Sequence, residues 1–173
     1  MRLSGGCQCG AVRYSADVET KTAHLCHCRM CQKAAGNYFM PLANAPLATF
    51  ELTRGALSHF HSSDLVRRGF CAICGTPLTF ETIEGVQHLN ITLGSLDDPE
   101  LVVPVEQSGI ESRIPWFEKL PKIFSSESFG SETDGGARLA AIFATNRQHP
   151  DHDTKVWPEP ATISSDGYET NQK

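Results

Sequence analysis

The sequence predicts a mainly β domain of short antiparallel strands with few short helices, held together by metal ions. Three observations support this prediction. Apolar and polar residues alternate in several short runs, most clearly in His88–Gly94, where Leu89, Ile91 and Leu93 are expected on one face. Glycine and proline separate these runs at short intervals. All seven cysteines of the chain fall into three tight clusters.

The alternating runs define the expected strands. These are Ala11–Ser15, Ala23–Cys26, Asn37–Met40, Ala48–Thr53, Leu57–His61, Leu78–Glu81, His88–Gly94 and Val102–Glu106. We expect Pro41 to end the third, because proline has no N–H to donate to a neighbouring strand. The turn Arg54–Gly55 predicts that the fourth and fifth form a hairpin. Pro104 favours an edge position for the last.

Helical patterns are few and short. Gln32–Gly36 is expected to form one turn stopped by glycine, and Pro115–Leu120 a short helix that begins with proline. Ala137–Ala144 carries a third, brief helical pattern. We therefore expect one zinc-binding domain over residues 1–130 and a C-terminal extension over 131–173, in which a short helix precedes a disordered tail from Asn146.

Length and charge restrict the class of partner. The chain has 173 residues and a formal charge of −5, so no basic surplus indicates nucleic-acid binding. The one adjacent pair of cations, Arg67–Arg68, is expected to flank a solvated turn. No apolar run approaches membrane-spanning length, and the first residues lack the apolar segment of a secretory signal. We therefore expect a cytoplasmic protein with neither membrane nor nucleic-acid partners, whose thiols remain reduced.

The two outer cysteine clusters have the spacing of a structural metal site. Cys7 and Cys9 lie two residues apart, and Cys71 and Cys74 form a C-x-x-C pair followed by Gly75, as in a zinc knuckle. Two such pairs complete a tetrahedral shell of four sulfurs. Spacing alone would also allow the first pair to combine with the central cluster.

The central cluster has three thiols, Cys26, Cys28 and Cys31, within six residues. They suit a second metal with three protein ligands and a coordination position for substrate, which is the arrangement of catalytic zinc. His24 and His27 are near enough in sequence to be the fourth ligand, although a histidine beside a metal more often lies outside the ligand shell.

Three other interpretations of the cysteines fit less well. A thioredoxin-like redox site requires a helix after its C-x-x-C, whereas Gly75-Thr76-Pro77 and a strand follow here. A nucleic-acid-binding zinc ribbon disagrees with the acidic charge balance. Buried free cysteines acting as small apolar residues do not explain three clusters.

The motifs around the cysteines resemble one known family. They are Gly6-Cys7-Gln8-Cys9-Gly10, Cys26-His27-Cys28-Arg29-Met30-Cys31, Phe70-Cys71-Ala72-Ile73-Cys74-Gly75-Thr76-Pro77-Leu78 and the later Ser112-Arg113-Ile114-Pro115-Trp116. In order and spacing they are similar to the glutathione-dependent formaldehyde-activating enzymes, whose GFA domain the centromere protein V group shares. The resemblance covers residues 3 to 125.

The resemblance implies a mainly β fold like that of the Mss4-like (β-tent-like) superfamily, with two zinc ions per chain. It assigns a structural zinc to Cys7, Cys9, Cys71 and Cys74, and a catalytic zinc to Cys26, Cys28 and Cys31.

The activity implied by the resemblance is that of a carbon–sulfur lyase, which joins formaldehyde to glutathione as S-(hydroxymethyl)glutathione. Its partners would be a small aldehyde and a small thiol. Glutathione is anionic, and Arg29, Lys33 and Arg113 are candidates to bind its carboxylates. The alternative is a non-catalytic, zinc-stabilised binding module with the same fold.

Overall fold

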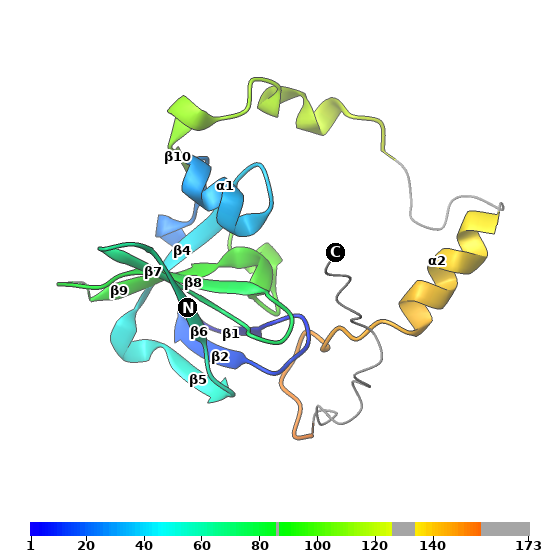
Figure 1. Ribbon diagram of the computed structural model, residues 1–173, viewed down its shortest axis with the longest axis horizontal. Helices are drawn as coiled ribbons and strands as arrows, with labels where there is room; N and C mark the ends of the chain where they lie inside the picture. The colour runs from blue at the N-terminus through cyan, green and yellow to red at the C-terminus, as the bar shows by residue number, and fades with distance from the viewer. Residues whose placement is uncertain (86, 126–133, 157–173) are drawn as a thin grey trace, which may run out of the picture.

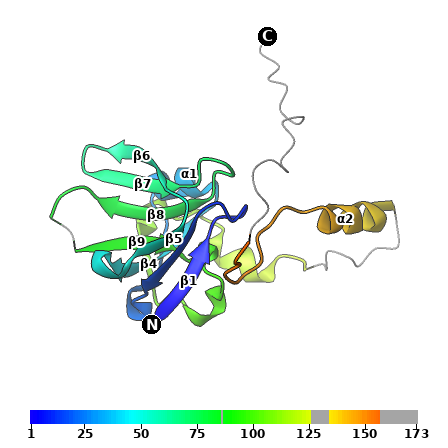
Figure 2. The ribbon, with the colours of Figure 1, turned by 90° about the horizontal axis from the view of Figure 1, so that it is seen from below.

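The computed structural model, described here for residues 1–85, 87–125 and 134–156, contains two β-sheets and few helices (Figures 1 and 2). The small sheet has the order β1-β2-β5, and the large one β10-β3-β4-β9-β8-β7-β6. The strands are β1 (Arg2–Gly6), β2 (Arg13–Asp17), β3 (His24–Cys26), β4 (Met40–Pro46), β5 (Glu51–Arg54), β6 (Ser58–Ser63), β7 (Val66–Phe70), β8 (Pro77–Thr82), β9 (His88–Thr92) and β10 (Glu106–Ser108). The expected mainly β class is confirmed.

Helical structure is limited, as expected. The α-helices are α1 (Arg29–Ala35) and α2 (Asp134–Ala144), and 3₁₀ turns lie at Thr20–Thr22, Leu47–Thr49, Leu93–Ser95, Pro99–Leu101, Ile110–Ser112 and Phe117–Lys122. Gly36, at φ 60°, ends α1 as expected. In Figure 1, α2 stands apart from the sheets, and the chain after it returns to them. Within the part of the chain described, no helix is both long and apolar enough to span a membrane.

The hydrophobic core lies between the two sheets. Tyr14 of β2 is fully buried, stacks on Phe50 and shares a hydrogen bond of 2.7 Å with Ser95. Ile91 and Leu78, from the large sheet, belong to the same buried cluster. Burying side chains of this size stabilises the fold by about 1.5–3 kcal/mol each.

The hairpin expected across Arg54–Gly55 does not form. β5 pairs with β2 in the small sheet, whereas β6 pairs with β7 in the large one. Gly55, at φ 68°, lies so close to the Ala11 carbonyl that an added Cβ would be 2.1 Å from its oxygen. The turn therefore carries the chain from one sheet to the other.

Two prolines have roles that the sequence did not predict. Pro41 does not end a strand but is the second residue of β4, where it pairs with Leu25 of β3. Pairing of β4 with β9 starts only at Leu42, so Pro41 has a neighbouring strand on one side only. The strand predicted over Val102–Glu106 does not form up to and including its proline. Strand β10 begins only at Glu106, and it lies at the edge of the large sheet.

Two further segments differ from expectation. The short helix predicted at Pro115–Leu120 is a 3₁₀ turn over Phe117–Lys122, which contains Pro121. At the other end, Arg2–Gly6 forms strand β1, which is not among the strands expected from the sequence. An added Cβ on Gly5 would lie 2.4 Å from the Ser95 carbonyl oxygen, so glycine is required there for close packing.

Part of the C-terminal extension packs against the small sheet. His149 is buried, its backbone N–H donates to the Gln8 carbonyl at 2.7 Å, and its ring covers Gly10. Arg54 donates to the Thr154 carbonyl. These contacts show that the disorder expected after Asn146 does not extend over this stretch. Residues 157–173, for which the same expectation was made, lie outside the described residues.

A buried ion pair between Arg13 and Asp97 also contacts this extension, through Asp153. Arg13 is 2% exposed and contacts Asp97 through two hydrogen bonds of 2.7 and 2.6 Å, while Asp153 accepts a further bond at 2.8 Å. Burial opposes ionisation of Asp97, but hydrogen bonds from Arg13 and Ser4 outweigh it and lower the pKa of this carboxyl.

We expect Asp97→Asn to lower the free energy of unfolding by about 3 kcal/mol, because the substitution leaves the buried Arg13 without its principal counter-ion. Because the pKa of Asp97 is lower in the folded state, its ionised carboxylate stabilises the fold at any pH above the unfolded-state pKa of about 3.9. This stabilisation is lost as the pH falls through the folded-state pKa. The deficit should therefore stay constant from about pH 5 to 8 and shrink only in stronger acid. Urea denaturation across this range measures it, with the exposed Asp98→Asn as control. A deficit that vanished already at pH 6 would contradict this assignment.

Candidate metal centres and the adjoining cavities

The four outer cysteines meet between the two sheets. Cys7 and Cys9 follow β1, and Cys71 and Cys74 occupy the turn between β7 and β8. Their sulfur atoms all lie within 4.8 Å of one another, with separations of 3.6 Å for Cys7–Cys9 and 3.8 Å for Cys9–Cys71. Sulfurs held tetrahedrally on zinc at 2.3 Å lie about 3.8 Å apart, so the donor set fits this ion.

The backbone around these sulfurs is arranged to stabilise thiolates. Val12 N–H points to Cys7 Sγ at 3.2 Å, and Ile73 N–H to Cys71 Sγ at 3.4 Å. Gly75, at φ 76°, allows its N–H to close the knuckle on the Cys71 carbonyl at 2.9 Å. The predicted zinc-knuckle conformation is therefore present.

One of these thiols is acidic even without a metal. Burial alone would raise the pKa of Cys74, but hydrogen bonds from Thr76 and from the backbone of Cys9 lower it to about 6. Burial instead raises the pKa of Cys7 and of Cys9. A metal ion bound here would hold all four as thiolates.

The central cysteines form a second group, at the junction of β3 and α1. Cys26 ends β3, Cys28 is the N-cap of α1, and Cys31 lies in the first turn of that helix. The three sulfurs lie within 4.8 Å of one another, and Cys26 and Cys28 are 3.5 Å apart. Cys28 Sγ also accepts the Cys31 N–H at 3.4 Å, so the helix start itself sets the spacing.

Neither candidate histidine joins this group. His27 is fully buried, its Nε2 lies 3.0 Å from the Gln107 side chain, and its ring packs against Phe39 and Phe117. It therefore anchors the start of α1 both to β10 and to the segment after it. The Nδ1 atom of His24 lies 2.9 Å from the Thr22 carbonyl oxygen, although the side chain lines the cavity beside the cysteines.

Arg68 is the principal residue of this site that the sequence did not reveal. It is 7% exposed, and its guanidinium donates to Cys31 Sγ at 3.5 Å and lies 4.8 Å from the Phe80 ring centroid. Its neighbour Arg67 instead pairs with Glu81 at 2.8 Å. Successive residues of a strand face opposite sides, so assigning this pair to a strand would have placed one cation inside.

Burial of Arg68 is informative because no carboxylate pairs with it among the residues described. A buried guanidinium without an anion costs several kcal/mol. Three thiolates on a divalent ion carry a net charge of −1, which would supply the missing counter-charge beside Cys31. Within the apo cluster, burial raises the pKa of Cys31 to about 12, although Arg68 opposes the shift. The charge balance thus favours a metal-bound trio.

A cavity of about 320 Å³ opens directly over the three sulfurs. Its walls combine apolar side chains, including Leu42 and Phe80, with the amides Asn44 and Asn90 and with Arg68. A space of this size admits a small organic molecule.

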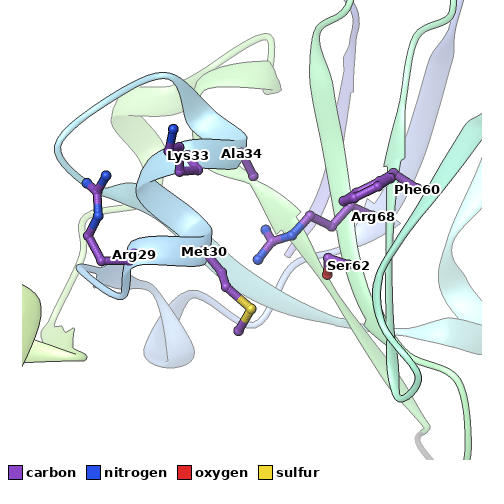
Figure 3. Close-up of a pocket in the computed structure, with 7 residues that line it drawn as sticks. All are labelled: Arg29, Met30, Lys33, Ala34, Phe60, Ser62 and Arg68. Carbon is purple, nitrogen blue, oxygen red and sulfur yellow. The ribbon is translucent and has the colours of Figure 1, made fainter.

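The three candidate cations separate in the structure. Arg29 and Lys33 lie on α1 and border a second cavity, of about 460 Å³, between α1 and the β6–β7 hairpin (Figure 3). Arg113 pairs with Glu118 at 3.1 Å and lies 5.6 Å from the Phe117 ring centroid, and it lines neither cavity.

Comparison with known proteins agrees with this geometry. The sequence profile of the glutathione-dependent formaldehyde-activating enzymes matches residues 2–111. No curated protein gives a significant match. Among solved structures, a crystal structure of a Rhodobacter sphaeroides protein superposes with a TM-score of 0.52 at 21% identity, covering 61% of this chain and 100% of the other. At that identity the superposition supports the fold alone.

The matched region contains both cysteine groups and both sheets. All seven cysteines lie within residues 2–111, and so do all ten strands found in the described residues. The chain belongs to the glutathione-dependent formaldehyde-activating enzyme family.

Proposed function

We propose that this protein is a zinc-dependent enzyme of the carbon–sulfur lyase class that joins a small aldehyde to a thiol, with formaldehyde and glutathione as the pair that its family suggests. One observation carries the proposal: three clustered thiols open into a cavity that also contains a buried arginine. A purely structural metal site would be closed by a fourth protein ligand.

We assign two zinc ions to the chain. Cys7, Cys9, Cys71 and Cys74 would hold the structural ion, and Cys26, Cys28 and Cys31 the catalytic one. Ligand sets made only of thiolates favour zinc over harder ions such as Mg²⁺ or Ca²⁺. Zinc bound by the trio would supply an acceptor for a substrate thiolate and an electrostatic attraction for the aldehyde oxygen.

The residues of the cavity would orient the two reactants. In the addition, the thiol sulfur forms a bond to the carbonyl carbon, the π electrons of C=O move to oxygen, and the proton that leaves sulfur ends on that oxygen. Arg68 lines the cavity and is placed to donate to the oxygen as negative charge develops. Apolar neighbours such as Phe80 and Leu42 exclude water and strengthen this interaction.

The remaining expectations complete the proposal. The partners are a small thiol and a small aldehyde rather than nucleic acid, which agrees with the net charge of −5. All seven cysteines are free in the structure, as suits the reducing cytoplasm in which we place the protein.

The test is a rate measurement at equilibrium, because the same addition also proceeds without a catalyst. We expect protein at micromolar concentration to raise the exchange rate between ¹³C-formaldehyde and its glutathione adduct, measured by exchange NMR. Metal analysis of the same sample should give two zinc ions per chain. Equal exchange rates with and without the zinc-loaded protein would exclude the enzyme and favour a zinc-stabilised binding module.

A further inference from the structure

The cavity over Cys26, Cys28 and Cys31 (the trio cavity) is larger than the proposed reaction of formaldehyde requires. Its volume is about 320 Å³. A water molecule occupies about 30 Å³ of the liquid, and formaldehyde has only one more non-hydrogen atom than water. Even with the sulfur of a thiol in place, formaldehyde would leave much of this space unfilled. The cavity therefore has room for an aldehyde of two or three carbons.

A row of paired residues forms one wall of the trio cavity. Arg68 of β7 pairs with Phe80 of β8, which pairs with Asn90 of β9. Asn90 pairs in turn with Asn44 of β4. Directly paired residues of antiparallel strands have their side chains on the same face of a sheet, and all four residues line the cavity. The row thus runs from the cation beside Cys31 to two neighbouring carboxamides.

The side-chain amides of Asn44 and Asn90 form no hydrogen bond with any other described residue. The backbone of Asn44 is held in place, because its N–H donates to Thr22 Oγ1 and its carbonyl accepts from the Glu19 N–H, each at 2.9 Å. Both side chains are half-buried and line the cavity. A carboxamide has two N–H donors and an accepting oxygen, and polar groups inside proteins normally have partners. A ligand in the cavity is placed to supply them.

The chemistry of this asparagine pair suits a neutral group that contains oxygen. Carboxamides carry no charge, and no carboxylate is among the described residues that line the cavity. The Cβ atoms of directly opposite residues lie about 4.5–5.5 Å apart, so both amides can reach the same oxygen atom. Arg68 lies over the Phe80 ring, 4.8 Å from its centroid, and in the proposed addition it donates to the carbonyl oxygen. The asparagines, as the next polar groups along the row, can then bind a second oxygen, carried by the carbon beside the carbonyl.

We propose that Asn44 and Asn90 bind an oxygen substituent on the carbon next to the carbonyl, so that the preferred aldehyde is a short α-oxygenated one, with a hydroxyl or a second carbonyl oxygen at that position. This inference rests on the proposed function, which places thiol addition at the trio. It extends that function from formaldehyde to a larger class of aldehyde, and it makes the two asparagines specificity-determining residues.

The kinetic test compares two aldehydes that differ by this oxygen. Propanal has the same number of non-hydrogen atoms as glycolaldehyde, but a methyl group replaces the hydroxyl. With each catalysed rate constant divided by the uncatalysed one, we expect kcat/KM of the wild type to be at least about tenfold higher for glycolaldehyde. Asn90→Leu, which replaces the carboxamide by an apolar group of similar shape, should abolish this preference. Asn37→Leu, at an exposed asparagine outside the cavity, is the matched control and should retain it. The zinc content of each variant reports that the fold is intact.

Binding of stable thioethers separates this inference from the proposed reaction. S-(2-hydroxyethyl)glutathione has a hydroxyl on the second carbon from sulfur, as the glycolaldehyde adduct does, whereas S-propylglutathione has a methyl group there. Neither can react, so calorimetric titration of the zinc-loaded protein reads the site even if no turnover is found. We expect wild type and Asn37→Leu to bind the hydroxyethyl compound about tenfold more tightly, and Asn90→Leu to bind both equally.

Equal binding of the two thioethers by wild type, binding of neither, or a preference that persists in Asn90→Leu would overturn the inference. Faster formaldehyde exchange without this preference would leave the proposed function standing and exclude only the role of the asparagines.

Discussion

Cys71→Ser should abolish folding of the domain. A structural zinc site contributes about 10–16 kcal/mol of apparent binding free energy, whereas whole domains are stable by only about 5–15 kcal/mol. The four outer cysteines join the turn after β1 in the small sheet to the turn between β7 and β8 in the large one. Their loss would therefore separate the two sheets that enclose the core. We expect loss of dispersed amide signals in ¹H–¹⁵N NMR and of the tightly held zinc.

A neighbouring substitution controls for damage to the turn itself. Ile73 lies in the same knuckle, is 56% exposed and offers no metal ligand, so Ile73→Ser should retain both fold and zinc. A Cys71→Ser protein with a native spectrum and two zinc ions would contradict the structural role of this site.

The cysteine clusters could be predicted from the sequence because their geometry is local. The Cys71–Cys74 knuckle and the Cys26–Cys31 turn each determine the spacing of their own sulfurs. Which pair meets which is a long-range property, and spacing alone left open whether Cys7 would join the trio. In the structure, Cys7 and Cys9 meet the knuckle and not the trio, with Cys9 Sγ 3.8 Å from Cys71 Sγ.

The errors concern segments whose partners are distant in sequence. The glycine turn at Gly55 has the local signal of a hairpin, but its close approach to the Ala11 carbonyl sends β5 to the other sheet. The sequence around His149 has no hydrophobic periodicity. Its packing against the small sheet depends on contacts with Gln8 and Arg54. Contacts between residues so far apart leave no pattern in a single sequence from which they could be predicted.

Arg68 illustrates the same limit within the site. Beside Arg67 it resembles an exposed cation, and only its place in β7 directs it inward toward Cys31. With Phe60 and Ser62 of β6 it also borders the cavity of about 460 Å³ beside α1, although these residues lack any motif. The two cysteine groups could therefore be predicted from the sequence, whereas the position of Arg68 beside Cys31 required the sheet topology.

The second large effect is expected at the trio, where Cys28→Ser should remove catalysis while the fold persists. Cys28 has two roles, as a sulfur of the trio and as the N-cap of α1. Serine is among the best N-cap residues, so the helix start should be preserved. A hydroxyl replaces one of only three thiolates, so zinc should fall from two ions per chain to one. We expect the formaldehyde–glutathione exchange rate to fall at least about 100-fold, toward the uncatalysed value.

The readouts distinguish a catalytic trio from a second structural site. If the trio were structural, Cys28→Ser would lower the free energy of unfolding as Cys71→Ser does. We instead expect a change below about 1 kcal/mol in urea denaturation, because the core cluster between the sheets contains none of the trio cysteines. Loss of one zinc with full retention of the exchange rate would place the chemistry elsewhere. A stable fold, one zinc ion and no acceleration together would identify the trio as the reactive centre.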